Sequence, residues 1–211
     1  GSLNPFSQYR DQISVNDVLN AREVVYPLTL PMCSPIGDGA AAAIIVSKKK
    51  AKELGLEHAV KVEACALSSG YDYEPGIGIE PPKAGATAIY ESAGVSPEDL
   101  DVIELHDASA ISEIMYYEYL GLCPTGEGGN FVESGATTLG GSIPVNTSGG
   151  LMRKGHPVGA TGISQLVELT WQLRGNAGER QVENAKVALA ENGGGFIGQD
   201  VAALVMTVLS R

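Results

Sequence analysis

Residues 146–162 read NTSGGLMRKGHPVGATG, a glycine-rich stretch that holds one histidine and an adjacent pair of basic residues. Glycine lets a ligand approach the backbone closely because it has no side chain. Pro157 suits the first position of a helix, where its missing N–H needs no partner. The pattern therefore predicts a helix that follows this stretch over 159–173, with His156 near its N-cap.

The predicted position of His156 favours a neutral imidazole, because the positive end of the helix dipole opposes an added proton. A neutral imidazole can accept a proton from a thiol or give one to a leaving group. Arg153 and Lys154 form a basic pair in an acidic chain and could contact a phosphate group. A structural glycine-rich turn with a capping histidine is the alternative interpretation.

Residues 102–105 are predicted to form a buried strand, and Glu104-Leu105-His106-Asp107 lies at its carboxyl end. Ligands gather at the carboxyl ends of strands in α/β sheets. His106 could donate a hydrogen bond to a substrate carbonyl oxygen and stabilise the oxyanion formed from it. Asp107 or Glu104 could then orient the ring. The alternative is a structural histidine beside helix-capping residues.

Residues 191–195 read ENGGG between two predicted strands, 187–190 and 201–209. The three glycines are typical of a tight turn, and they also allow a ligand to approach the backbone. Glu191 or Asn192 could face a site at the end of the first strand. A hairpin turn without any functional role explains the same residues.

The rest of the chain alternates between predicted strands and helices, which indicates an α/β layered fold with a largely parallel sheet. The run from Ala40 to Val46 is apolar throughout and suits a strand buried on both faces. In the helix predicted for 109–120, apolar residues recur at helical spacing and are expected to face the core. These residues are Ile111, Ile114, Met115 and Tyr119. Other predicted strands span 60–67 and 143–145, other helices 48–54 and 83–93, and loops 68–82 and 121–142.

Composition excludes several classes of function. The chain has 211 residues and a net charge of −11, and it shows none of the basic stripes by which proteins bind nucleic acid. It contains no run of about 18 apolar residues, so no membrane span is expected. Its three cysteines are widely spaced, which argues against a disulfide framework and against a zinc site. These features favour a cytoplasmic protein without a bound metal.

Taken together, these segments resemble the C-terminal part of the thiolase superfamily, and most of all its sterol carrier protein X-type, or lipid-transfer, branch. Residues 155–162, GHPVGATG, are similar to the superfamily signature GHP-x-G-[AS]-[ST]-G. Residues 104–107, ELHD, resemble the His-Asp motif of this branch, and 37–42 and 171–175 also fit. The resemblance extends from about Asn4 to the end of the chain.

The resemblance implies a thiolase-like layered fold, in which a βαβαβαββ half packs its helices on a mixed, largely parallel sheet. Residues 1–58 would be the end of a loop region plus the last strand and helix of an N-terminal half. Residues 59–211 would be the C-terminal domain. The nucleophilic cysteine would belong to the N-terminal half that is missing here, so this chain alone is expected to be inactive.

By the same resemblance, His156 would activate the nucleophile and His106 would bind the thioester oxygen. Ser148, Gly149 and Gly150 would lie near the pantetheine arm of coenzyme A, which is a substrate rather than a cofactor. Thiolases also use a second cysteine as acid and base. At the two positions where the superfamily carries it, this chain has Glu191 and Ala108. Proton transfer would then fall to Glu191 or His106.

Three functions remain open at this point. The first is an acyl-CoA acyltransferase that performs thiolytic cleavage or Claisen condensation of a 3-ketoacyl-CoA. The second is a thiolase-fold aldolase for CoA-linked side chains, a class that pairs with a small OB-fold partner protein. The third is a non-catalytic thiolase-like partner subunit. A homo-oligomer is also expected, because half of a thiolase would expose an apolar face.

Overall fold

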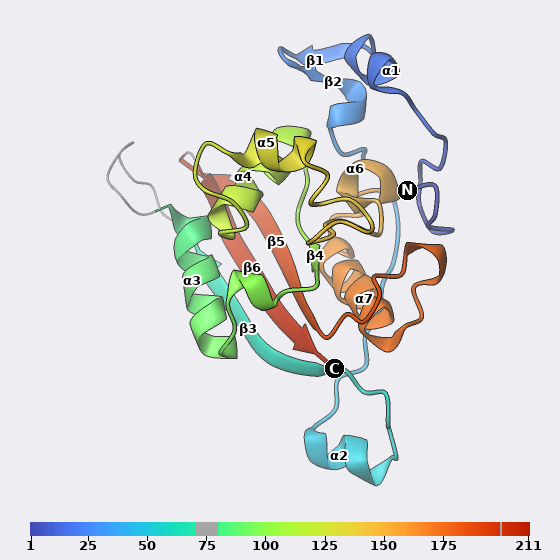
Figure 1. Ribbon diagram of the computed structural model, residues 1–211, viewed down its shortest axis with the longest axis vertical. Helices are drawn as coiled ribbons and strands as arrows, with labels where there is room; N and C mark the ends of the chain where they lie inside the picture. The colour runs from blue at the N-terminus through green and yellow to red at the C-terminus, as the bar shows by residue number, and fades with distance from the viewer. Residues whose placement is uncertain (71–79, 199) are drawn as a thin grey trace.

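A four-stranded sheet forms the centre of the computed structural model, which describes residues 1–70, 80–198 and 200–211 (Figure 1). The strand order is β3–β6–β5–β4. β6 is antiparallel to both β3 and β5, whereas β4 is parallel to β5. β3, β4 and β5 therefore run in one direction, which confirms the mixed, largely parallel sheet. The bounds are β3 (Lys61–Ser69), β4 (Val102–Glu104), β5 (Val187–Ile197) and β6 (Asp200–Ser210).

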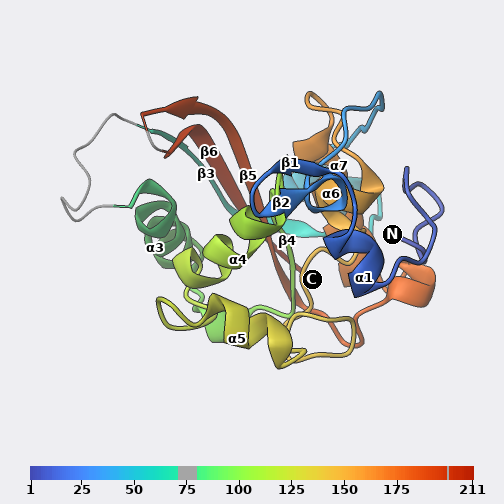
Figure 2. The ribbon, with the colours of Figure 1, turned by 90° about the horizontal axis from the view of Figure 1, so that it is seen from above.

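Helices cover both faces of this sheet (Figure 2). α3 (Pro81–Ala93) and α4 (Ala110–Tyr119) share one apolar core with the sheet, and α7 (Thr161–Arg174) shares a second core on the opposite face. Val102 and Ile103 are neighbours on β4 but belong to different cores. They separate because successive side chains of a strand point to opposite faces. The α/β layered class is confirmed.

The helix ends follow the local sequence as expected. α3 ends at Gly94 and α7 at Gly175, both in the left-handed conformation that glycine adopts without steric cost. The Ser109 hydroxyl caps α4 by accepting a hydrogen bond from the Ser112 N–H at 3.3 Å. Ser14 likewise caps α1 (Val15–Leu19). Capping serines and terminal glycines are therefore sufficient to place these helix ends.

The face of α4 that packs against the core differs from the predicted one. Ile111 and Met115 are 42% and 44% exposed, whereas Tyr116 and Tyr117 are buried. Tyrosine can bury its ring when its hydroxyl finds a partner. The Tyr117 hydroxyl donates to Glu113 Oε1 at 2.5 Å. The prediction was wrong for Ile111 and Met115, whereas Tyr119 packs against the core as expected.

Residues 1–58 lie largely apart from the sheet, as Figure 1 shows. The strand predicted over 40–46 is wrong: residues 37–47 form no regular element, and Ile44 and Ile45 are 94% and 81% exposed. An apolar run becomes a strand only where a neighbouring strand satisfies its backbone groups, and the described residues offer none here. Regular elements in this region are β1 (Glu23–Val25), β2 (Leu28–Thr29), the 3-10 helix η1 (Leu30–Met32) and α2 (Lys48–Glu53).

Two loop predictions and one strand prediction need correction. Residues 193–195 lie inside β5, because Gly193 pairs with Leu204 and Gly194 with Ala203 of β6 and the pairing resumes at Phe196. The predicted loop 121–142 contains α5 (Gly128–Glu133). Instead of a strand over 143–145, only Val145 makes a parallel bridge to Ile103. Of the predicted loop 68–82, residues 71–79 lie outside the described residues.

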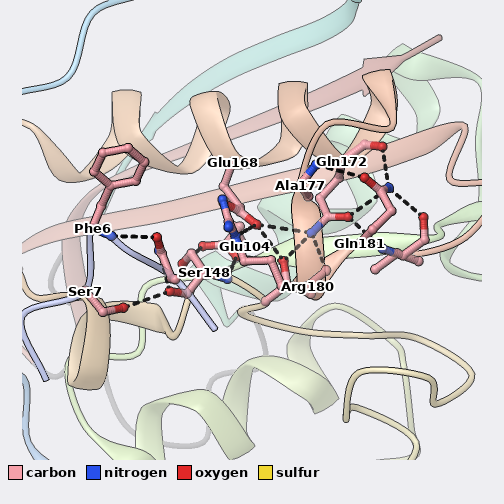
Figure 3. Close-up of polar contacts among 12 residues, drawn as sticks. Phe6, Ser7, Glu104, Ser148, Glu168, Gln172, Ala177, Arg180 and Gln181 are labelled. Carbon is pink, nitrogen blue, oxygen red and sulfur yellow. Dashed lines mark hydrogen bonds and ion pairs between the residues drawn. The ribbon is translucent and has the colours of Figure 1, made fainter. Parts of the chain in front are cut away.

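A buried ion pair attaches α7 to the segment that leads into β5 (Figure 3). Arg180 lies at the end of the 3-10 helix η3 (Gly178–Arg180), and its Nε donates to Glu168 Oε1 at 2.8 Å. Its Nη2 donates to Glu168 Oε2 at 2.9 Å, so the contact is bidentate. The two side chains are only 7% and 2% exposed. The Gln172 amide also donates to the Arg180 carbonyl oxygen at 2.8 Å.

Removal of this arginine should destabilise the fold strongly. Arg180→Met should lower the free energy of unfolding by about 3–5 kcal/mol, because it leaves the Glu168 carboxylate buried without its partner. Urea denaturation followed by circular dichroism measures the change. Lys49→Met is the matched control, since Lys49 pairs with Glu53 at 4.0 Å on the surface and should contribute less than about 1 kcal/mol. Equal effects of the two substitutions would contradict the prediction.

Candidate active site

The two histidines singled out in the sequence lie in contact. The ring centroids of His106 and His156 are 4.9 Å apart, and the rings meet edge to face at 85°. His106 follows β4, and His156 follows the short helix α6 (Gly150–Lys154). Both rings are half-buried. The fold thus joins two motifs that are 50 residues apart in the sequence.

The backbone of the His106 segment is fixed by two side chains. The His106 N–H donates to Glu191 Oε2 at 2.8 Å, and the Leu105 N–H donates to Asn146 Oδ1 at 2.9 Å. Glu191 is fully buried on β5, and burial raises its pKa to about 7 despite this hydrogen bond and one from Tyr116. Glu191 therefore contacts the backbone beneath His106, and the imidazole is the group that reaches the surface.

Glu104 and Asp107 fix the glycine-rich stretch instead of orienting the His106 ring, so that part of the sequence interpretation was wrong. Glu104 accepts hydrogen bonds from the N–H of Ser148 at 2.9 Å and from its hydroxyl at 2.6 Å. Asp107 Oδ1 accepts from the Leu151 N–H at 2.6 Å. Both carboxyl groups are buried, and burial raises the pKa of Glu104 to about 7 and that of Asp107 well above its usual value.

Close approach to Asp107 explains one of the glycines. Gly150 has φ of 57°, and a Cβ at this position would lie 2.2 Å from Asp107 Oδ2. Only glycine leaves room for the carboxylate at the first turn of α6. Ser148, also expected near the pantetheine arm, is fully buried and its hydroxyl is bound to Glu104. Gly149 precedes α6 with φ of 100°. This glycine-rich segment therefore serves the internal packing of the protein.

His156 lies farther from the start of α7 than expected, because the N-cap is Ala160. The helix begins at Thr161, and Pro157 instead starts a turn in which its carbonyl oxygen accepts from the Thr161 N–H at 3.0 Å. The His156 backbone pairs with Ile36, and its ring Nδ1 lies 2.8 Å from Thr161 Oγ1. Residues 158–160 lie between the histidine and the helix, because they form the turn that this hydrogen bond closes.

Both imidazoles are nevertheless held neutral. Burial, together with the neighbouring His156 and Lys154, lowers the pKa of His106 to about 4. Burial also lowers the pKa of His156, and the Lys154 ammonium adds to this effect. A neutral ring can accept a proton at one nitrogen and donate one from the other. The expected protonation state is thus reached by burial in place of a helix dipole.

The basic pair is directed toward partners within the chain. The Arg153 guanidinium lies 5.6 Å from the centre of the Tyr9 ring and donates to the Asp11 carbonyl oxygen. Lys154 Nζ donates to Ser164 Oγ at 2.7 Å, on the first turn of α7. Neither cation has a carboxylate partner within 4.0 Å among the described residues. Lys154 is the one that acts on the two histidines electrostatically.

Asn192 follows Glu191 on β5 and is half-buried at the same site. Within the described residues, its Oδ1 atom has no hydrogen-bond partner, and neither does Gln165 Oε1. The Gln165 amide donates to the Glu191 carbonyl oxygen at 2.8 Å. Unsatisfied buried polar atoms are rare in native proteins and each calls for an explanation. Their position beside Glu191 is consistent with a functional site.

The sequence analysis missed the segment 33–36, which passes along both motifs. Cys33 pairs with Ser109, and the Ser34 N–H donates to the Ala108 carbonyl oxygen at 2.9 Å. Ile36 then pairs with His156. This segment is rich in proline and lacks periodicity, so only its position before the matched residues 37–42 could have revealed it. The described residues contain no cluster of three or more side chains suited to hold a metal ion.

A groove of about 430 Å³ lies between α3 and α4 and is lined by Tyr90 and Tyr119, among others, but by neither histidine. In the part of the chain that the structure describes, no helix is long and apolar enough to cross a bilayer.

Comparisons with known proteins identify relatives of this chain. The chain is 46% identical over 197 residues to human sterol carrier protein 2, a match covering 90% of this chain and 36% of that protein. It is 43% identical over 198 residues to an acetyl-CoA acetyltransferase of Methanothermobacter thermautotrophicus, covering 92% of this chain and 51% of that protein. The chain therefore spans about half or less of the length of these relatives.

A solved structure shares the fold over nearly the whole chain. The structure titled Ltp2-ChsH2(DUF35) aldolase superposes with a TM-score of 0.83 at 25% identity, covering 99% of this chain and 54% of that one. The family model described as thiolase C-terminal domain-like matches residues 76–207. That segment is more than half of the chain and includes His106, His156 and the carboxylates that hold them, so this chain belongs to the thiolase C-terminal domain-like family.

Proposed function

We propose that the protein containing this chain is an acyl-CoA acyltransferase that cleaves or forms a 3-ketoacyl-CoA through an acyl-cysteine intermediate. The observation that carries the proposal is the contact of two neutral imidazoles, His106 and His156, at 4.9 Å. A pair of this kind supplies one proton acceptor and one hydrogen-bond donor for a thioester. Kinship with an acetyl-CoA acetyltransferase supports the same class of reaction.

In the proposed reaction, Nε2 of His156 accepts the proton of a cysteine thiol that lies outside this chain. The thiolate attacks the thioester carbonyl carbon, and the resulting oxyanion accepts a hydrogen bond from His106. The carbon–sulfur bond to coenzyme A then breaks, and the leaving thiolate takes the proton from His156. Coenzyme A is a substrate here, and the proposal needs no further cofactor.

Claisen condensation also requires removal of a proton from the carbon next to the thioester, and this step needs a proton acceptor other than His156. The two candidates, Glu191 and His106, differ in how deeply they are buried. Glu191 is fully buried and bound to the His106 backbone, while the His106 ring is half-buried and near His156. We assign this step to His106, with Glu191 as its support. Asn192, which has an unpaired Oδ1, would contact the substrate from the same side.

Lys154 and Arg153 are assigned to the phosphate groups of coenzyme A. Both are partly buried in the last turn of α6 and lack carboxylate partners among the described residues. We further propose a cytoplasmic homo-oligomer, because Ile36 and Ile44 are 99% and 94% exposed and would be covered by further protein.

An aldolase for CoA-linked side chains is the second candidate. The structural likeness to the Ltp2-ChsH2(DUF35) aldolase favours it, as does the absence of a thiol at positions 108 and 191. Such an enzyme would act with a small OB-fold partner protein. A non-catalytic partner subunit is the third.

Intact-protein mass spectrometry separates the three functions. The full-length protein is incubated with acetyl-CoA and with acetoacetyl-CoA, and its mass is compared with that of untreated protein. An acetyl adduct that coenzyme A removes supports the acyltransferase. Retro-aldol cleavage of a 3-hydroxyacyl-CoA without any adduct supports the aldolase, and the absence of both reactions supports the partner subunit.

Loss of the proposed base should slow acylation. In the full-length protein, His156→Gln should lower the acylation rate by roughly 10²–10⁴-fold, the usual contribution of a general base. Quenched-flow measurement of adduct formation gives the rate. His58→Gln is the control, because His58 is exposed on the connection between α2 and β3. A His156→Gln rate within a few-fold of the wild-type rate would contradict the role.

The pH dependence of acylation should report the lowered pKa of His156. The unprotonated ring is the active form, so the rate falls as the pH drops through this pKa. Because burial places the pKa below 6.5, the acidic limb of kcat/KM should have its midpoint below pH 6.5. A midpoint at or above pH 6.5 would show that another group or environment controls the rate.

Charge reversal at the basic pair should weaken binding of coenzyme A. Lys154→Glu in the full-length protein should raise the Kd by about tenfold or more, since a hydrogen bond to a charged group contributes about 1.5–3 kcal/mol. Isothermal titration calorimetry measures the affinity. Lys49→Glu on the exposed helix α2 makes the same change in net charge and should leave the Kd nearly unchanged. Equal Kd values for both variants would exclude the phosphate contact.

A further inference from the structure

We propose that Thr161 is a positioning residue that fixes the tautomer of His156. Its hydroxyl would hold the proton of the neutral ring on Nδ1 and leave Nε2 as the nitrogen that accepts the thiol proton. This inference rests on the proposed function for its catalytic consequence, whereas the tautomer itself is a property of the structure. It assigns a task to a residue that touches neither the thiol nor the thioester.

Two hydrogen bonds of the Thr161 hydroxyl bear on the direction of the contact. Oγ1 donates to the carbonyl oxygen of Pro157 at 3.2 Å, and Oγ1 lies 2.8 Å from Nδ1 of His156. A hydroxyl has one proton to donate and lone pairs to accept with. With that proton on the contact to the Pro157 oxygen, the ring is the donor to Oγ1 and carries its proton on Nδ1. The opposite assignment, in which the hydroxyl donates to Nδ1, places the ring proton on Nε2, and the two assignments give different nitrogen chemical shifts.

The hydroxyl is held rigidly enough to enforce this choice. Thr161 is the first residue of α7 and is 0% exposed. Its N–H donates to Pro157 O at 3.0 Å, and its own carbonyl oxygen accepts from Ser164 Oγ at 2.8 Å. The helix that carries it is attached to the body by the Glu168–Arg180 ion pair. Oγ1 is therefore held at a fixed distance from both of its hydrogen-bond partners.

The other ring nitrogen remains available. Among the described residues, Nδ1 has a hydrogen-bond partner, whereas none is found for Nε2 of His156. The ring is in contact with His106, and Lys154 opposes the gain of a second proton. If the proton moved to Nε2, the ring would have no acceptor on that side. Control of the tautomer therefore decides whether this imidazole can act as a base.

The test compares a hydroxyl with a methyl group of the same shape. Thr161→Val removes the hydroxyl, Thr161→Ser keeps it, and Thr170→Val makes the same change on the same helix, at a hydroxyl for which the described residues provide no side-chain hydrogen bond. Full-length protein labelled with ¹⁵N on histidine reports the tautomer through the Nδ1 and Nε2 chemical shifts. His156→Gln assigns the signals, and urea unfolding verifies that each variant is folded.

Wild-type protein, Thr161→Ser and Thr170→Val should show a protonated Nδ1 and an unprotonated Nε2. Thr161→Val should populate the Nε2-protonated tautomer and acylate about tenfold more slowly, the equivalent of one net hydrogen bond. The proposal is overturned if wild-type His156 is protonated on Nε2, if Thr161→Val leaves the shifts unchanged, or if Thr161→Ser is as slow as Thr161→Val. Should the wild-type protein form no acyl adduct, the proposed function fails while the chemical shifts still decide the tautomer.

Discussion

Buried carboxylates that bind backbone N–H groups are the interaction on which this site depends. Glu104, Asp107 and Glu191 come from the sheet or the segment directly after it, and each accepts from a loop that carries or precedes a histidine. Strand ends are rigid, so hydrogen bonds from them transmit that rigidity to glycine-rich loops that have little intrinsic order. Without these contacts, nothing would fix the segments 104–107 and 146–156 relative to each other.

The cost of burying so much negative charge explains other features of the molecule. Burial pushes the pKa of Glu104 and Glu191 to about 7, so both groups sit near the boundary between carboxylate and acid. The network continues through Thr147 to Glu168, where Arg180 supplies the compensating charge (Figure 3). Lys154 contributes positive potential on the other side of the site. The histidines are neutral in this setting, which suits proton transfer with a thiol.

Local sequence signals located most of the elements and both histidines. Gly94 and Gly175 ended the expected helices, and Ser109 capped α4. The strand over 40–46 failed because an apolar pattern cannot reveal whether a pairing neighbour exists. The expected face of α4 failed because Tyr117 buries its ring through a hydrogen bond to Glu113, a contact that hydropathy does not register. Helix ends could be predicted because a few consecutive residues determine where a helix begins or stops.

The sequence by itself determined the α/β class, the kinship with thiolases and the identity of the two histidines, because these depend on short-range patterns and on a specific motif. Only the tertiary structure decided what each side chain touches. In the folded chain, Asp107 accepts a hydrogen bond from α6, Glu191 accepts one from the backbone of His106, and Thr161 contacts the ring of His156. The first two contacts join residues 44 and 85 positions apart. No local pattern encodes such contacts, since they exist only after the strands and helices have packed together.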